Sequence, residues 1–319
     1  MNNIYKIITV AIGVLFLFYF IHLFDELPKI NFRDFLLEVN WLYVGISLLA
    51  YLLSHALRAL RIAILMGRQD YSLLKLVYLQ YYTNGINLIL PFKLGEVYRI
   101  IEFNKIIKDN NKLVLTVIAE KTLDLLVLFI WAILAISFLG NGIVELKIVI
   151  WVISALIMFS MGIFFVLPEN LKTLNLVIAK RYNTRTVIYI LSLTTRILKV
   201  ISNIKIILKS NFSTISLITL MIWLLEVVGF AYLLPFMTEK VQVWLLSILV
   251  FLSSLIPSAS LGLGGLQLGF SSLDYKANQF NSLLISLTYQ AFIFSPAVLL
   301  GLLLHMVVSL NKKSKQRLK

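Results

Sequence analysis

Charged side chains within long apolar stretches are the residues of this sequence best placed to do chemistry. Arg58 and Arg61 are three positions apart, and Glu120 and Asp124 are four apart, so each pair shares one face of a helix. A charge at the centre of a bilayer costs about 2.5–3.5 kcal/mol and therefore needs a partner or water. The two acids repel each other unless cations lie close to them. We expect Arg58, Arg61 and Arg99 to be those cations.

Proline and glycine interrupt the apolar sequence at about 71–108. Asn87 precedes Pro91, and Gly95 follows it with Glu96 as the next residue. Irregular backbone at membrane depth is tolerated only where protein buries it or water reaches it. We therefore predict a re-entrant segment with Pro91 and Gly95 at its hinge, lining a cavity.

A second interruption has a similar order of residues. Pro257 ends an apolar approach, glycines follow at Gly262, Gly264 and Gly265, and Gln267 stands where the first interruption has a carboxylate. Broken segments in corresponding halves of a chain indicate an internal repeat with a binding site at its interface. We predict a second re-entrant segment here, and an inverted repeat remains one interpretation of the match.

The elements that must position these residues are helices in a membrane. Of 319 residues, 60% are hydrophobic and 14% are charged, whereas soluble domains have roughly 25% charged residues. The fold class predicted is all-α, a polytopic bundle of about six to eight transmembrane helices with two re-entrant segments. Expected helices lie at about 4–24, 41–66, 113–139, 146–167, 213–236, 241–256 and 280–308. The absence of cysteine excludes disulfides and thiolate metal sites.

The distribution of the net charge of +14 predicts the topology. Segment 168–212 has eight Lys/Arg and one acid, so the positive-inside rule places it in the cytoplasm. Its second half is either a helix in the inner interface or a helix packed on the bundle. The acidic loop 25–40 is expected outside. The predicted organisation is one transmembrane domain, 1–310, and a basic cytoplasmic tail, 311–319, with both termini cytoplasmic.

Together these motifs resemble the lysylphosphatidylglycerol synthase transmembrane-domain family, also called flippase-like. The resemblance covers nearly the whole chain and implies a bundle with re-entrant helices that translocates a lipid. Gln267 departs from the glutamate usual in the family, which removes one ionisable group. The fused soluble synthase domain is expected to be absent, so we predict no enzymatic activity. The ordered set that carries the resemblance is Arg58, Arg61, Asn87, Pro91, Gly95, Glu96, Arg99, Glu120, Lys121, Asp124, Pro257, Gly262, Gly264 and Gly265.

The function expected is translocation of an anionic or zwitterionic phospholipid, an aminoacyl-phospholipid or a polyprenyl-phosphate-linked glycolipid across the cytoplasmic membrane. The arginines would bind a lipid phosphate, since guanidinium suits bidentate phosphate contact. One alternative is an ion-coupled transporter of a small polar or anionic solute. Another is a membrane protein that assists a lipid or glycan synthesis enzyme without transport. The substrate-binding residues predicted are Arg58, Arg61, Asn87, Glu96, Arg99, Glu120, Asp124 and Gln267.

The sequence predicts few partners other than membrane lipids. We expect a homo-oligomer or a lipid or glycan synthesis enzyme as a protein partner, and no nucleic acid. No cofactor is expected. The three histidines, His22, His55 and His305, lack metal-ligand spacing, so no metal is expected and each is interpreted as a polar group near a helix end.

Overall fold

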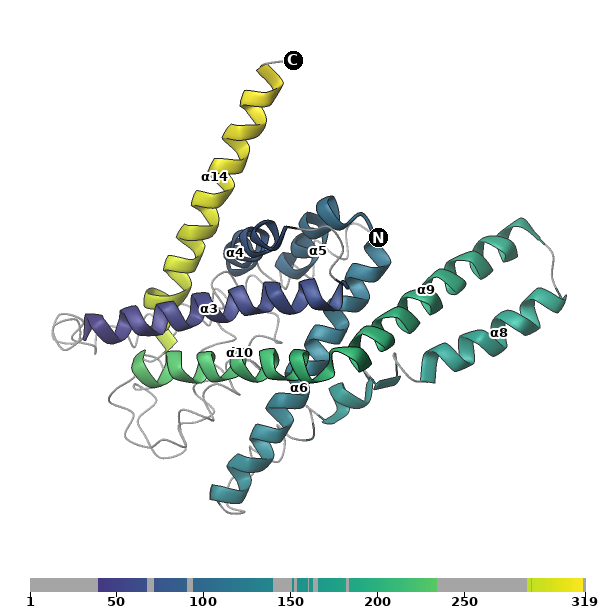
Figure 1. The fold of residues 1–319 in the computed structure, drawn as a ribbon, viewed down its shortest axis with the longest axis horizontal. Helices are drawn as coiled ribbons and strands as arrows, with labels where there is room; N and C mark the ends of the chain where they lie inside the picture. Colours follow the sequence, from purple (N-terminus) through teal and green to yellow (C-terminus); the bar gives the residue numbers. More distant parts are fainter. Residues whose placement is uncertain are drawn as a thin grey trace, which may run out of the picture. The chain divides into compact units, whose positions relative to one another are not determined.

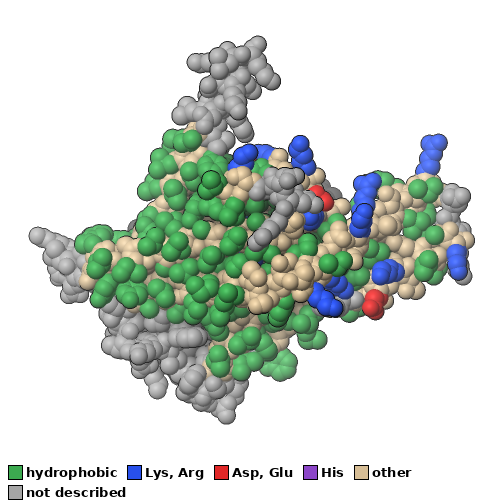
Figure 2. Space-filling view, in the orientation of Figure 1, with side chains coloured by type: hydrophobic (Ala, Val, Ile, Leu, Met, Phe, Trp, Pro, Cys, Tyr) green, Lys and Arg blue, Asp and Glu red, His purple; other side chains and the backbone are tan. Residues whose placement is uncertain are grey.

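The computed structural model is almost entirely helical in the residues it describes, which confirms the all-α prediction (Figure 1). The apolar runs at 4–24 and 241–256, the second interruption and the acidic loop 25–40, apart from Asn40, lie outside these residues. Hydrophobic side chains are spread widely over the described surface visible in Figure 2, as expected for a protein surrounded by lipid. The residues described are 40–67, 72–90, 94–139, 151, 154–159, 161–162, 166–181, 184–233, 286–287 and 289–317.

Apolar run length predicted several helix boundaries well. The run expected at 41–66 is α3, and the run expected at 213–236 is α10. The last helix was predicted to end at 308, which is wrong, because α14 continues to Arg317. Lys and Gln favour helix as strongly as most apolar residues do, but hydropathy does not count them. The elements are α3 (Trp41–Leu65), α4 (Leu73–Ile89), α5 (Leu94–Ile107), α6 (Asn110–Leu139), α8 (Leu167–Arg181), α9 (Arg185–Ser210), α10 (Phe212–Leu233), the π-helical η4 (Gln290–Phe294) and α14 (Ser295–Arg317).

Three helical segments in the described part of the chain are long and apolar enough to cross a membrane. They are Trp41–Leu65, Val187–Ser210 and Phe212–Leu233. The first and third bury 50% and 44% of their most apolar window, whereas the second buries only 11%. Length and composition therefore group together three segments whose surroundings differ greatly.

The chain forms two compact units, each built from segments that are distant in sequence. The first unit contains residues 1–52, 81–98 and 226–319. The second contains residues 53–80 and 99–225. Helices α3, α4, α5 and α10 each contribute one part to each unit.

In the second unit, apolar faces with helical spacing form two hydrophobic clusters. Ile215, Ile218 and Ile222 of α10 pack against Ile64 and Leu65 of α3. The spacing of three and four residues places the α10 isoleucines on one face, which explains why they are buried together. The α9 face formed by Ile201 and Ile204 packs against Leu115 and Ala119 of α6.

Aromatic side chains and small residues hold the first unit together. Phe230 stacks on Tyr289 with ring centroids 4.7 Å apart. Helices α4 and α14 meet at two glycines, where a Cβ added to Gly85 would lie 2.7 Å from the Cα of Gly301. That distance leaves no room for a side chain, so the two helix backbones touch directly. Ser47 of α3 adds a hydrogen bond by donating to the carbonyl of Gly229 at 2.6 Å.

The first proline and glycine interruption does end a helix. Helix α4 ends at Ile89, and α5 begins at Leu94. A Cβ on Gly95 would overlap both the backbone and the side chain of Asn87, so the two helix ends are packed closely against each other. Pro91 lies outside the described residues, and the re-entrant path through a membrane remains a prediction.

The basic segment 168–212 is almost entirely helical, with α8 and α9 running side by side as a hairpin in the second unit (Figure 1). The hydroxyl of Thr194 donates to the Asn175 side chain at 2.8 Å and joins the two helices. The sequence left two interpretations open for this segment, a helix in the membrane interface and a helix packed on the bundle, and the two halves of α9 differ in the same way. Its C-terminal half packs on α6 through Ile201 and Ile204, and most side chains of its N-terminal half are exposed.

Candidate functional site

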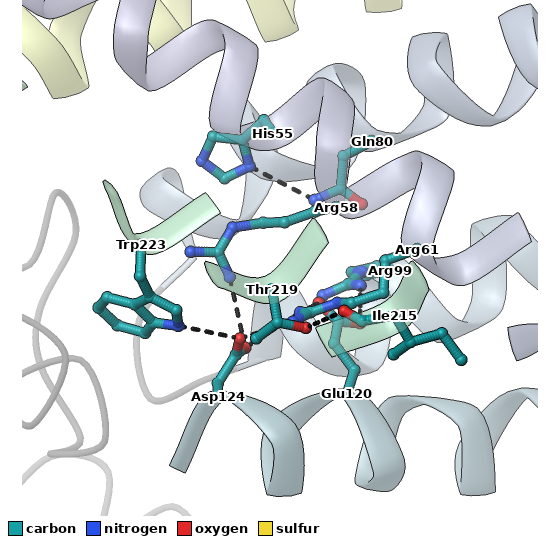
Figure 3. A network of polar contacts seen from close by, with 10 residues as sticks. All are labelled: His55, Arg58, Arg61, Gln80, Arg99, Glu120, Asp124, Ile215, Thr219 and Trp223. Atoms are coloured by element: carbon teal, nitrogen blue, oxygen red, sulfur yellow. Dashed lines mark hydrogen bonds and ion pairs between the residues drawn. The ribbon is translucent and has the colours of Figure 1, made fainter. Parts of the chain in front are cut away.

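In the second unit, segments of three helices bring five predicted site residues together. Helix α3 carries Arg58 and Arg61 on adjacent turns, and α6 carries Glu120 and Asp124 in the same way. Arg99 comes from α5. The spacings of three and four residues aim both members of each pair at the facing helix (Figure 3).

Arg61 and Asp124 form the centre of this arrangement. The Arg61 Nη1 donates to Asp124 Oδ1 at 2.7 Å, and Nη2 donates to Oδ2 at 3.2 Å. Two parallel bonds between a guanidinium and a carboxylate give both strength and a fixed orientation. Both side chains are fully buried. Removing one partner of such a pair costs about 3–5 kcal/mol, because the other charge stays buried without compensation.

Glu120 links the centre to a second arginine. Its Oε1 lies 3.1 Å from Arg61 Nη2, and its Oε2 accepts from Arg99 Nη2 at 2.6 Å. The Arg99 guanidinium also lies over the ring of Phe103, 5.8 Å from the centroid. Glu120 is fully buried, whereas the Arg99 side chain is 8% exposed.

Arg58 approaches the centre from the Asp124 side. Its Nη1 lies 3.5 Å from Asp124 Oδ2, and its guanidinium carbon lies 6.0 Å from the centroid of the Trp223 ring. The Trp223 indole donates to Asp124 Oδ1 at 3.2 Å. Thr219, one turn earlier on α10, accepts from Arg61 Nη1 at 3.1 Å. Helix α10 therefore completes the coordination of Asp124 and Arg61.

The five charged residues form a chain of alternating sign, which we call the ion chain: Arg99, Glu120, Arg61, Asp124 and Arg58. Its three central members are fully buried, and the two arginines at its ends have side chains 8% and 13% exposed. It contains three positive and two negative groups. A buried ion pair adds little net stability compared with apolar residues of the same volume, so stability alone does not explain this cluster.

Other predicted site residues are placed elsewhere or lie outside the description. Asn87 and Glu96 belong to the first unit and are half-buried. Five of the eight predicted substrate-binding residues are members of the ion chain, which lies in the second unit. Those outside the described residues are Gln267, Pro91, Pro257, Gly262, Gly264 and Gly265.

Sequence reasoning missed several polar neighbours of the ion chain. Thr219 and Trp223 were absorbed into an apolar span, although their spacing of four residues places both on one face. His55 was expected near a helix end, which is wrong. It lies in the middle of α3, buried, with Nδ1 3.4 Å from the Gln80 side-chain nitrogen. A polar residue in the middle of an apolar span was the available signal.

Comparison with protein families gives a match over nearly the whole chain. The family model described as lysylphosphatidylglycerol synthase TM region matches residues 6–301. Comparison with curated proteins and with solved structures gives no match. The resemblance drawn from the ordered motifs is thereby confirmed, and the apolar helices agree with a protein of the membrane. The chain belongs to the family of the lysylphosphatidylglycerol synthase TM region.

Proposed function

We propose that this protein translocates a phosphate-bearing lipid across the cell membrane. The observation that carries the proposal is the ion chain, which begins and ends with a guanidinium inside an apolar helical domain. A lipid head group cannot cross hydrocarbon unaided, because its charge would lose its hydration. Arginines held at membrane depth replace that hydration with charge-assisted hydrogen bonds.

The members of the ion chain would have different roles. Arg61 is fully buried and bound on both sides by carboxylates, so it positions the others. Arg58 and Arg99 are the least buried members, with side chains 13% and 8% exposed, and they would contact the phosphate. The ion chain has three positive groups and two negative ones, so a bound phosphate with one negative charge would bring its net charge to zero. The carboxylates keep the arginines from binding the anion too tightly to release it.

The protein would act by binding and release, without covalent chemistry. We place it in the cell membrane as a multi-pass protein with both termini cytoplasmic. The acidic loop 25–40 favours this side for the N-terminus, and the basic segments 168–212 and 311–319 favour it for the rest. Phospholipid, aminoacyl-phospholipid and polyprenyl-phosphate-linked glycolipid share the phosphate that the arginines would recognise.

The test is lipid movement in proteoliposomes that contain a fluorescent phosphatidylglycerol, followed by chemical quenching of the outer leaflet. Wild-type protein should speed transfer between leaflets, and Arg99→Gln should lower the rate at least about tenfold, since a lost charge-assisted bond contributes roughly 1.5–3 kcal/mol. Arg99→Lys should retain part of the rate because it keeps the charge. Lys105→Gln is the matched control on the same helix, since its side chain is 53% exposed.

Three outcomes would reject the proposal. Wild-type rates in both Arg99→Ala and Glu120→Ala would remove the ion chain from the mechanism. Uptake of a water-soluble anion without lipid transfer would support a solute carrier instead. No transfer at all by folded wild-type protein would favour a partner of a synthesis enzyme.

A further inference from the structure

We propose that the α8–α9 hairpin is an arm that lies in the membrane interface and binds anionic lipid head groups. This surface is separate from the ion chain. The proposal rests on the protein being in a membrane and does not depend on what the ion chain binds or moves.

The apolar side of the arm is one continuous stripe along α9. Its inner residues, Ile201 and Ile204, are 1% and 0% exposed and pack on α6. The same helical spacing continues outward through Ile197 to Leu193 and Ile190, which are 42% and 44% exposed. The stripe therefore extends along α9 beyond the part that packs on α6. Lipid acyl chains would cover the remainder at no cost in exposed apolar area.

Basic residues of α9 lie away from the stripe. At 100° per residue, Lys199 lies opposite the stripe, and Arg185 and Arg196 lie on its flank, about 100–120° away; all three are exposed. Across both helices, residues 167–210 contain eight Lys/Arg and one acid, Glu169. Figure 2 shows lysine and arginine side chains along the hairpin with hydrophobic ones between them. Positive charge of this density complements the phosphates of an anionic leaflet.

The two other locations for the arm each carry a cost that the interface avoids. In water, the exposed stripe residues Ile190 and Leu193 would stay uncovered, as would Leu174 and Leu176 of α8. As a transmembrane span, α9 would place Arg196 and Lys199 near the middle of the bilayer. Each charge there carries the same free-energy penalty as any other charge at the bilayer centre. An interfacial helix keeps apolar groups about 5–10 Å into the acyl boundary and charges among the head groups.

Depth measurements along α9 test this placement directly. Because the chain has no cysteine, a single introduced cysteine takes a nitroxide label at one defined position. Ile188→Cys, Thr195→Cys and Ser202→Cys are seven residues apart on one exposed face, about 10 Å from one label to the next. In nanodiscs containing phosphatidylglycerol, all three labels should report the same shallow depth. Labels that deepen by about 10 Å toward the middle of the helix would show a span, and labels fully accessible to water would show a free arm. Either result overturns the proposal.

A second measurement tests the charge requirement in the full-length protein. A polarity-sensitive fluorophore on Leu193→Cys should emit at shorter wavelength in phosphatidylglycerol nanodiscs than in phosphatidylcholine nanodiscs. The double change Arg196→Gln/Lys199→Gln should lower the ratio of membrane-bound to free arm about 30-fold. Each basic residue near an anionic surface contributes roughly a fivefold effect, and the two effects multiply. An equal spectrum in both lipids, or no effect of the double change, would contradict the proposal. Lys105→Gln is the control outside the arm, and Tyr189→Cys replaces the label site if Leu193→Cys fails to fold.

Discussion

Neutralising Asp124 is the most direct test of how the ion chain is held together. In Asp124→Asn the Arg61 guanidinium keeps its burial but loses its bidentate carboxylate, whose two bonds are 2.7 Å and 3.2 Å long. Leaving a buried charge uncompensated costs about 3–5 kcal/mol. Glu120 still lies 3.1 Å from Arg61 Nη2, so the lower end applies. We expect a loss of about 3 kcal/mol, or roughly 150-fold in the unfolding equilibrium.

The assay is SDS-induced unfolding in mixed micelles, followed by circular dichroism. Lys105→Gln is the matched control, because an exposed pair contributes at most about 1 kcal/mol. The double variant Arg61→Met/Asp124→Leu removes both charges and replaces them with apolar groups. It should be about 2 kcal/mol more stable than the sum of the two single changes predicts. An Asp124→Asn protein as stable as Lys105→Gln, or additive effects in the double variant, would refute the reasoning.

Three further changes test the packing of the helices, each read by the same unfolding assay. Gly85→Ala should destabilise by about 1–3 kcal/mol, because its Cβ would lie 2.7 Å from the backbone of α14. Gly45→Ala, which meets nothing within 4 Å, should not destabilise, and equal losses would contradict the close-contact argument. Ile204→Ala should cost about 2–5 kcal/mol because the side chain is fully buried, whereas Ile206→Ala, at 63% exposed, should change stability little. Thr184→Ala should cost about 0.5–2 kcal/mol by removing the side-chain oxygen that accepts from the Val187 amide, and an unchanged stability would show that this cap contributes nothing.

The sequence predicted most of the helices because apolar run length is a local property. It failed at the end of α14, where lysines extend a helix that hydropathy treats as finished. It also treated 168–212 as a polar connector with one helix, although two helices occupy nearly all of it. Lys, Leu and Ile all permit helix although their polarities differ, so a polar composition did not rule out a second helix there.

The candidate site was predictable in its charged members and not in its neutral ones. Spacing alone placed Glu120 beside Asp124, and charge balance indicated arginine partners. Trp223 and Thr219 are about a hundred residues or more from the groups they contact. Their contribution depends on the rotation of α10 about its axis relative to α3 and α6, which no local spacing encodes.

The contact between Gly85 and Gly301 has a consequence for the order of assembly. The two residues are separated by 216 positions, so α4 leaves the ribosome roughly 10–40 s before its partner helix is synthesised. All segments of the second unit, including every member of the ion chain, are complete once Leu225 has been translated. The charged unit can therefore form while the first unit still lacks its last helix. During that interval the face of α4 that carries Gly85 lacks the helix that buries it.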